Sequence, residues 1–102
     1  MIDSFSPNTI DSSEAKKTIE KAIKKFGEAS QIIMTIEETS ELTQALTKCL
    51  RGHNNQDNIA EEIADVYIVL KSLEIIFNNE NEVDNYIKEK ISRLKKIVDS
   101  CP

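Results

Sequence analysis

Glycine and proline, the residues that most often interrupt regular structure, are scarce in this chain, with two of each among 102 residues. A β-sandwich needs a turn about every 8–12 residues, and this sequence has too few turn residues for that. Apolar residues instead recur at intervals of three and four, which is typical of helices. The sequence therefore predicts an all-α fold: a four-helix bundle with short connections, forming one domain over 1–102.

Helix start and stop signals divide the chain into an arm and four helices. Residues 1–11 form an irregular arm that ends in Asp11, a good helix N-cap. Gly27 is the predicted end of the first helix, and Asp57 or Asn58 is expected to cap the third. Polar connections are expected at 51–58 and 77–85. The predicted helices cover 12–26, about 29–48 or a little beyond, and about 58–77, and a final helix carries an apolar stripe to about residue 98.

The apolar residues of these helices are more numerous than a short chain can enclose. The third helix contains IADVYIVL (63–70), in which Asp65 is the single charge, so we expect protein on all its sides. We therefore expect a homodimer or a dimer of dimers, the alternative being a monomeric bundle covered by the first helix. The expected apolar stripe of the second helix consists of Ile32, Ile33, Ile36, Leu42, Ala45, Leu46, Cys49 and Leu50.

Overall charge and composition exclude several classes of partner. A net charge of −5 disfavours binding to a nucleic-acid polymer or an anionic membrane, and the apolar residues are too dispersed for a membrane span. Cys49 and Cys101 lie far apart, without the spacing of a zinc site. No export signal is recognisable at the start of the sequence, so a cytoplasmic location is expected.

Two acidic motifs are the strongest functional signal. EETSE contains Glu38 and Glu41, and EEIAD contains Glu62 and Asp65; each pair lies on one helical face because its members are three residues apart. An antiparallel hairpin of the second and third helices would bring four carboxylates around one space. The alternatives are solvated surface acids or a protonated, hydrogen-bonded Asp65. An unpaired charge in an apolar helix is costly, and no basic residue lies between Arg51 and Lys71.

An all-oxygen, highly charged ligand set favours Mg²⁺, with Mn²⁺ as a possible substitute. A di-iron bundle is excluded because it needs two Glu-x-x-His pairs, and His53 is the single histidine. Mg²⁺ prefers to share oxygens with a substrate phosphate. A nucleotide or another polyphosphate is therefore the expected substrate class.

The position of the polar connection conflicts with a symmetric hairpin. The acidic pairs are centred at 39.5 and 63.5, which puts the turn of a level hairpin near 51.5, whereas the polar connection 51–58 is centred near 54.5. This difference would misalign the pairs by about 9 Å. We therefore predict an asymmetric connection: either the second helix stops near Lys48, or the chain runs back along that helix before the third begins.

The two motifs, EExxE and then ExxD after 20 residues, resemble the signature of the MazG family of nucleoside triphosphate pyrophosphohydrolases. The surrounding sequences EETSELTQALTKCLRG and NIAEEIADVYIVLKSLEIIF are also similar to short MazG-like proteins, and the resemblance covers about 28–80 well. It implies a MazG-like bundle completed by dimerisation. It also implies Mg²⁺-dependent hydrolysis of NTPs or dNTPs to the monophosphate and pyrophosphate. The implied metal ligands are Glu38, Glu41, Glu62 and Asp65.

The same resemblance gives Glu37 and Glu61 supporting catalytic roles, in holding a further metal, supporting the ligands or orienting the attacking water. Lys48 and Arg51 are candidates for the triphosphate, although both also suit the negative end of a helix dipole. Two other functions stay open: a helical nucleotide-binding or regulatory module without turnover, and a small oligomeric structural protein. Turnover that depends on Asp65 would distinguish the enzyme from both.

Overall fold

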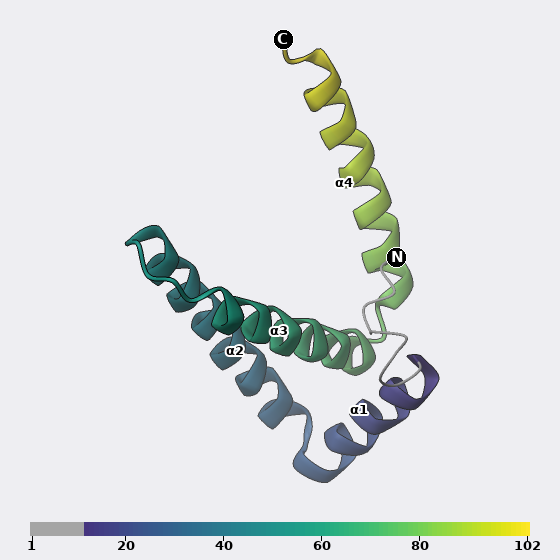
Figure 1. Cartoon of the computed structure of the whole chain (residues 1–102). Helices are drawn as coiled ribbons and strands as arrows, with labels where there is room; N and C mark the ends of the chain where they lie inside the picture. The colour runs from purple at the N-terminus through teal and green to yellow at the C-terminus, as the bar shows by residue number, and fades with distance from the viewer. Residues whose placement is uncertain (1–11) are drawn as a thin grey trace.

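The computed structural model describes residues 12–102, and these residues form four helices joined by short connections (Figure 1). The prediction of an all-α chain with four helices is confirmed, while the predicted arm and the Asp11 cap lie outside the described residues. None of the described helices combines the length and apolar character needed to cross a membrane. The helices are α1 (Ser12–Phe26), α2 (Glu28–Leu50), α3 (Gln56–Phe77) and α4 (Glu80–Ser100).

Gly27 separates α1 from α2 by itself. Its backbone has φ 92° and ψ 155°, a conformation that is essentially restricted to glycine. Its N–H still donates to the carbonyl oxygen of Ile23 at 2.8 Å, and α2 begins at the next residue. The prediction that Gly27 ends the first helix is therefore confirmed, and the two helices meet at a sharp angle (Figure 1).

The connection between α2 and α3 is asymmetric, as predicted. α2 continues to Leu50, and the side-chain amide of Asn55 then donates to the carbonyl oxygen of Ala45 at 3.0 Å. Because Ala45 lies more than one turn before the end of α2, the chain has run back along that helix before α3 starts. The predicted caps Asp57 and Asn58 are wrong: Asn55 precedes the first residue of α3, and Asp57 lies in its first turn.

The connection between α3 and α4 is shorter than predicted. Asn78 adopts the left-handed conformation (φ 49°, ψ 48°), which asparagine tolerates better than most residues, and α4 starts two residues later. The expected turn over 77–85 is therefore wrong. Glu80 and Glu82 belong to the first turn of α4, where acidic side chains interact favourably with the helix dipole.

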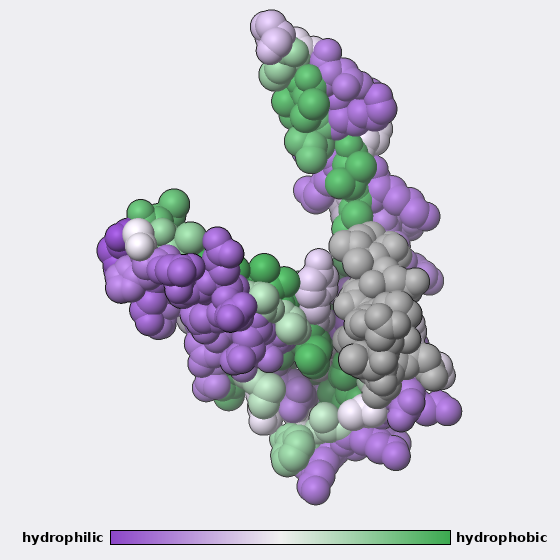
Figure 2. All heavy atoms as spheres, in the orientation of Figure 1, coloured by the Kyte–Doolittle hydropathy of each residue, from purple (hydrophilic) through white to green (hydrophobic). Residues whose placement is uncertain are grey.

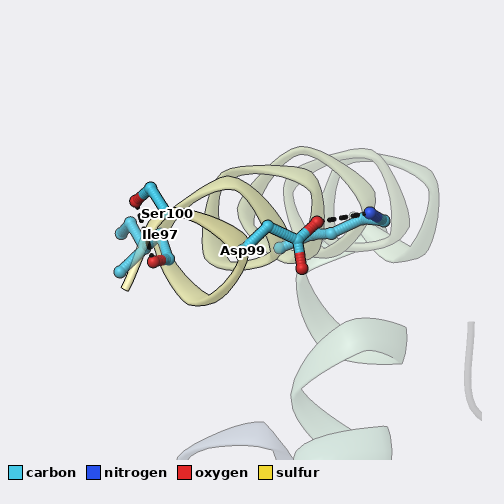
Figure 3. A network of polar contacts seen from close by, with 4 residues as sticks. Ile97, Asp99 and Ser100 are labelled. Carbon is cyan, nitrogen blue, oxygen red and sulfur yellow. Dashed lines mark hydrogen bonds and ion pairs between the residues drawn. The ribbon is translucent and has the colours of Figure 1, made fainter. Parts of the chain in front are cut away.

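α4 extends away from the rest of the chain and, among the described helices, contacts α3 alone (Figure 1). None of its residues is buried. At its end Lys95 forms an ion pair with Asp99 at 2.6 Å, and the Ser100 hydroxyl donates to the carbonyl oxygen of Ile97 at 3.0 Å (Figure 3). A single copy therefore has an α2–α3 hairpin flanked by α1, with α4 projecting from one end.

The buried face of α2 differs from the predicted apolar stripe. The buried residues of α2 are Gln31, Thr35 and Ala45, whereas Ile33 and Ile36 are exposed. Small or hydrogen-bonded side chains permit close helix approach, and the Thr35 hydroxyl is satisfied by the carbonyl oxygen of Gln31 at 2.9 Å. Periodicity identified the helix, but within the predicted stripe Ala45 alone is buried, Ile32 and Leu42 are half-buried, and the other members are exposed.

α3 is also less enclosed than predicted. Its buried residues are Glu62, Val69 and Ser72, while the apolar side chains of Ile63, Ile68 and Leu70 are partly exposed in the single copy. Most of the apolar surface that the sequence assigns to a core is therefore uncovered by the described part of this chain.

Candidate metal centre

α2 and α3 run alongside each other and bring the two acidic motifs together (Figure 1). Glu38 and Glu41 lie one turn apart on α2, and Glu62 and Asp65 lie one turn apart on α3. The sequence alone determines each pair. Their approach accompanies the asymmetric connection, in which the Asn55 side chain holds the start of α3 against the carbonyl oxygen of Ala45.

The carboxylates form two overlapping groups. Glu38, Glu41 and Glu62 each offer an oxygen, and these three atoms lie within 4.8 Å of one another. The oxygens offered by Glu61, Glu62 and Asp65 meet the same limit. Glu62 belongs to both groups and links them. We call these five residues the acidic centre.

Glu62 is the most enclosed member of the acidic centre, with 9% of its surface exposed. One carboxylate oxygen of Glu62 and one of Glu38 (Oε2 in each) are buried and have no hydrogen-bond partner among the described residues. A buried oxygen without a partner is unfavourable, and most such atoms in folded proteins are satisfied by protein, water or an ion. Both atoms therefore suit coordination to a cation.

The electrostatic environment also favours a cation. Burial, followed by the nearby charges of Asp65, Glu41 and Glu62, raises the pKa of Glu38 above its ordinary value of 4.5. Burial, followed by the charges of Glu41, Asp65 and Glu61, raises the pKa of Glu62 above the same value. A bound divalent cation would replace this repulsion by attraction.

No basic side chain neutralises the acidic centre within 12–102. The ion pairs of α3 join Lys71 to Glu74 at 3.5 Å and to Glu80 at 4.0 Å, beyond the centre. Among the described residues, Asp65 forms none of these ion pairs. Asp65 is only partly buried, however, so its isolation among apolar neighbours in the sequence overstated its enclosure.

The other predicted site residues lie at the edge of the acidic centre or beyond it. Glu61 is exposed and belongs to one group, whereas Glu37 is exposed and belongs to neither. Lys48 is exposed in the last turn of α2, about 10 Å along the helix from Glu41. Arg51 is exposed just after that helix, where its backbone N–H donates to the carbonyl oxygens of Thr47 and Lys48.

The central position of Glu62 was not singled out by the sequence analysis. The signal was its spacing: Glu62 precedes the buried Val69 by seven residues, two helical turns, and therefore shares its face.

Comparison of the chain with protein-family models, with curated proteins and with solved structures finds no match in any of the three.

Proposed function

We propose that this protein is a Mg²⁺-dependent nucleoside triphosphate pyrophosphohydrolase, which converts an NTP or dNTP to the monophosphate and pyrophosphate. One observation carries the proposal: Glu62 joins two carboxylate groups between α2 and α3, and unpartnered buried oxygens of Glu38 and Glu62 lie in the centre. The resemblance of the two acidic motifs to the MazG signature supplies the substrate class.

The donor set fits a hard divalent cation. The proposed ligands are Glu38, Glu41, Glu62 and Asp65, and all offer oxygen, as Mg²⁺ and Mn²⁺ prefer. When bound, Mg²⁺ would neutralise charge on the phosphate oxygens and lower the pKa of water. An acidic chain would otherwise repel a triphosphate, since its net charge is −5.

Residues at the edge of the acidic centre take the remaining proposed roles. Glu61 is exposed next to Glu62 and Asp65, so its carboxylate is accessible to water and would accept the proton of the attacking water. Glu37 would support Glu38 from the solvent side. Lys48 and Arg51, at the end of α2, would bind the outer phosphates through long side chains.

The test measures pyrophosphate release from a panel of NTPs and dNTPs with Mg²⁺ and with EDTA. We expect release that needs the metal and falls by about 100-fold or more in Asp65→Ala and in Glu62→Gln, because each variant removes a carboxylate from the ligand set. Glu28→Gln is the matched control, since it removes an acid from the first turn of α2, ten residues before Glu38.

Absence of pyrophosphate release from every substrate, in a protein with a native helical spectrum, would overturn the proposed activity. Titration calorimetry with the same nucleotides then identifies a binding module if heat is evolved. Release that survives EDTA or both substitutions would place the reaction outside the acidic centre.

A further inference from the structure

Most apolar side chains of α4 are exposed, while Val83 and Ile87 are half-buried. A stripe of this length exceeds the scattered apolar residues that a monomer normally exposes. Figure 2 shows it along the side of α4 that faces the α2–α3 hairpin, with hydrophilic atoms on the opposite side. The most exposed members, at 52% to 61%, are Tyr86, Ile91, Leu94, Ile97 and Val98.

The described part of the chain also has a small core. The buried apolar residues are Ala15, Ile19, Ala45 and Val69, and no side chain of the described residues is fully buried. The chain exposes 7929 Å², whereas a folded monomer of 11.5 kDa exposes about 5,800 Å². Its radius of gyration is 16.1 Å, compared with about 13 Å for a globular chain of this length.

We propose that α4 pairs with α4 of a second copy of this chain, antiparallel and across a two-fold axis near residues 90 and 91. Each copy exposes about 2,100 Å² more than a folded monomer of its mass. If half of this excess is buried on each copy, the interface buries about 2,100 Å² in total, which is the size of an obligate dimer interface. An identical chain supplies the same stripe in equal amount, so a two-fold axis covers both faces at once.

The residue spacing on α4 fits helix pairing. Ile87, Ile91, Leu94 and Val98 are separated by four, three and four residues, as in the seam of a coiled coil. An axis between 90 and 91 places Ile87 opposite Leu94 of the second copy, and Val83 opposite its Val98. Every one of these pairs is apolar.

The charge distribution along α4 favours the antiparallel orientation. Residues 80–86 contain acidic and no basic side chains, whereas 88–96 contain five basic side chains and one acidic. An antiparallel pair separates the acidic first turns of the two copies and places each of them beside residues 95–101 of the other copy, which include Lys95 and Lys96. A parallel pair would align like charges along its whole length and would be less stable.

The first test compares two substitutions of equal charge change by sedimentation velocity over a range of concentrations. The unmodified chain is expected to sediment at twice the chain mass of 11.5 kDa. Leu94→Glu, in the seam, should weaken association by about 100-fold or more, because two carboxylates would be buried across the axis. Ser92→Glu, on the opposite face of α4, should leave the dimer intact. A monomeric unmodified chain, or a Leu94→Glu dimer of unchanged affinity, would overturn the proposal.

The second test needs no destabilising substitution in the seam. In a Cys49→Ser background Cys101 is the single thiol, and antiparallel pairing places the two copies of Cys101 about 30 Å apart. A short bis-maleimide should therefore leave this protein uncoupled. Adding Glu80→Cys places a thiol opposite Cys101 of the second copy and should give covalent dimers. Efficient coupling through Cys101 alone, or no coupling after Glu80→Cys, would contradict the antiparallel α4 pair.

Discussion

At the scale of single residues, Glu62 explains most of the behaviour expected of the acidic centre. It belongs to both carboxylate groups and is the least exposed of their members. Its charge is therefore the least well solvated of the group, and Glu41, Asp65 and Glu61 repel it. Without a cation the repulsion between these carboxylates opposes folding. With a divalent cation bound, the same carboxylates would supply the affinity for the metal.

The first prediction concerns pH in the absence of metal. The pKa values of Glu38 and Glu62 are raised in the folded state, so the folded protein binds more protons than the unfolded chain above the ordinary value of 4.5. The contribution of these groups to stability is complete below that value and is lost as the pH rises through the raised values. Urea denaturation in EDTA should therefore show greater stability near pH 5 than near pH 7.

The Glu62→Gln variant provides the comparison for the pH dependence. It removes one titrating group and one repulsive charge, so its stability should depend less on pH and exceed that of the unmodified protein at neutral pH. Equal slopes in the two proteins, or a slope of opposite sign, would show that the acidic centre does not control the pH dependence.

The second prediction concerns stabilisation by Mg²⁺. A ligand that binds only the folded state stabilises it by about 2.7 kcal/mol at one hundred times its Kd. Thermal unfolding should therefore shift upward with Mg²⁺ in the unmodified protein and in Glu28→Gln, and should not shift in Glu62→Gln. An equal shift in all three proteins would mean that the cation binds elsewhere.

At the scale of secondary-structure elements, two backbone features set the geometry around the acidic centre. Gly27 lets α2 start directly after α1, and the Asn55 side chain ties the start of α3 to the carbonyl oxygen of Ala45. Neither feature contributes apolar contact area. Both act by restricting how the helices can be arranged.

The third prediction tests the backbone at Gly27. Gly27→Ala should lower the free energy of unfolding by about 1–3 kcal/mol, since an alanine is strained at this φ and ψ. A Cβ at this position would meet no atom within 4 Å, so backbone strain is the whole cost. Ser30→Ala, on an exposed turn of α2, is the control and should change stability little. Equal stability of the two variants would refute the strain argument.

The fourth prediction tests the tie between α2 and α3. Asn55→Ala removes the hydrogen bond to Ala45 and should cost about 1 kcal/mol in urea denaturation. It should also weaken Mg²⁺ binding, because the alignment of Glu62 with Glu38 and Glu41 depends on that connection. Asn54→Ala, at the exposed neighbouring residue, is the control. Loss of stability without loss of metal affinity would mean that the hairpin keeps its alignment by packing alone.

At the scale of the whole molecule, most of the large apolar side chains of the described residues lie on the outside of a single copy. The α2–α3 hairpin buries polar and small residues such as Thr35, Ala45 and Ser72. Much of the apolar surface of α3 and α4 is not covered by the described residues. The proposed α4 pair accounts for one of these faces.

The fifth prediction follows from that proposed pair. If folding and association are coupled, the temperature of thermal unfolding should rise with protein concentration, because mass action favours the folded dimer. The Ser92→Glu variant should show the same concentration dependence as the unmodified chain. Unfolding at a constant temperature over a hundredfold range of concentration would argue for an independently stable monomer.

Helix identity and the spacing of acids within each helix could be predicted from the sequence alone. The bounds of α1, the stop at Gly27 and the placement of each acidic pair on one face depend on interactions within a few residues. The start of α3 and the short link before α4 were predicted less well. Several Asn and Asp residues in those segments are equally suitable as caps, and helix packing selects among them.

Which side of each helix faces the other depends on how the helices pack. α2 buries Thr35 and leaves Ile33 and Ile36 exposed, and α3 buries Glu62 more deeply than Asp65. These outcomes depend on how far α3 is displaced along α2, which the Asn55 tie to Ala45 helps to set. The four helices and the two acidic pairs follow from the sequence, because helical periodicity is local. Only the packing of segments more than twenty residues apart could join those pairs into one centre and leave α4 uncovered.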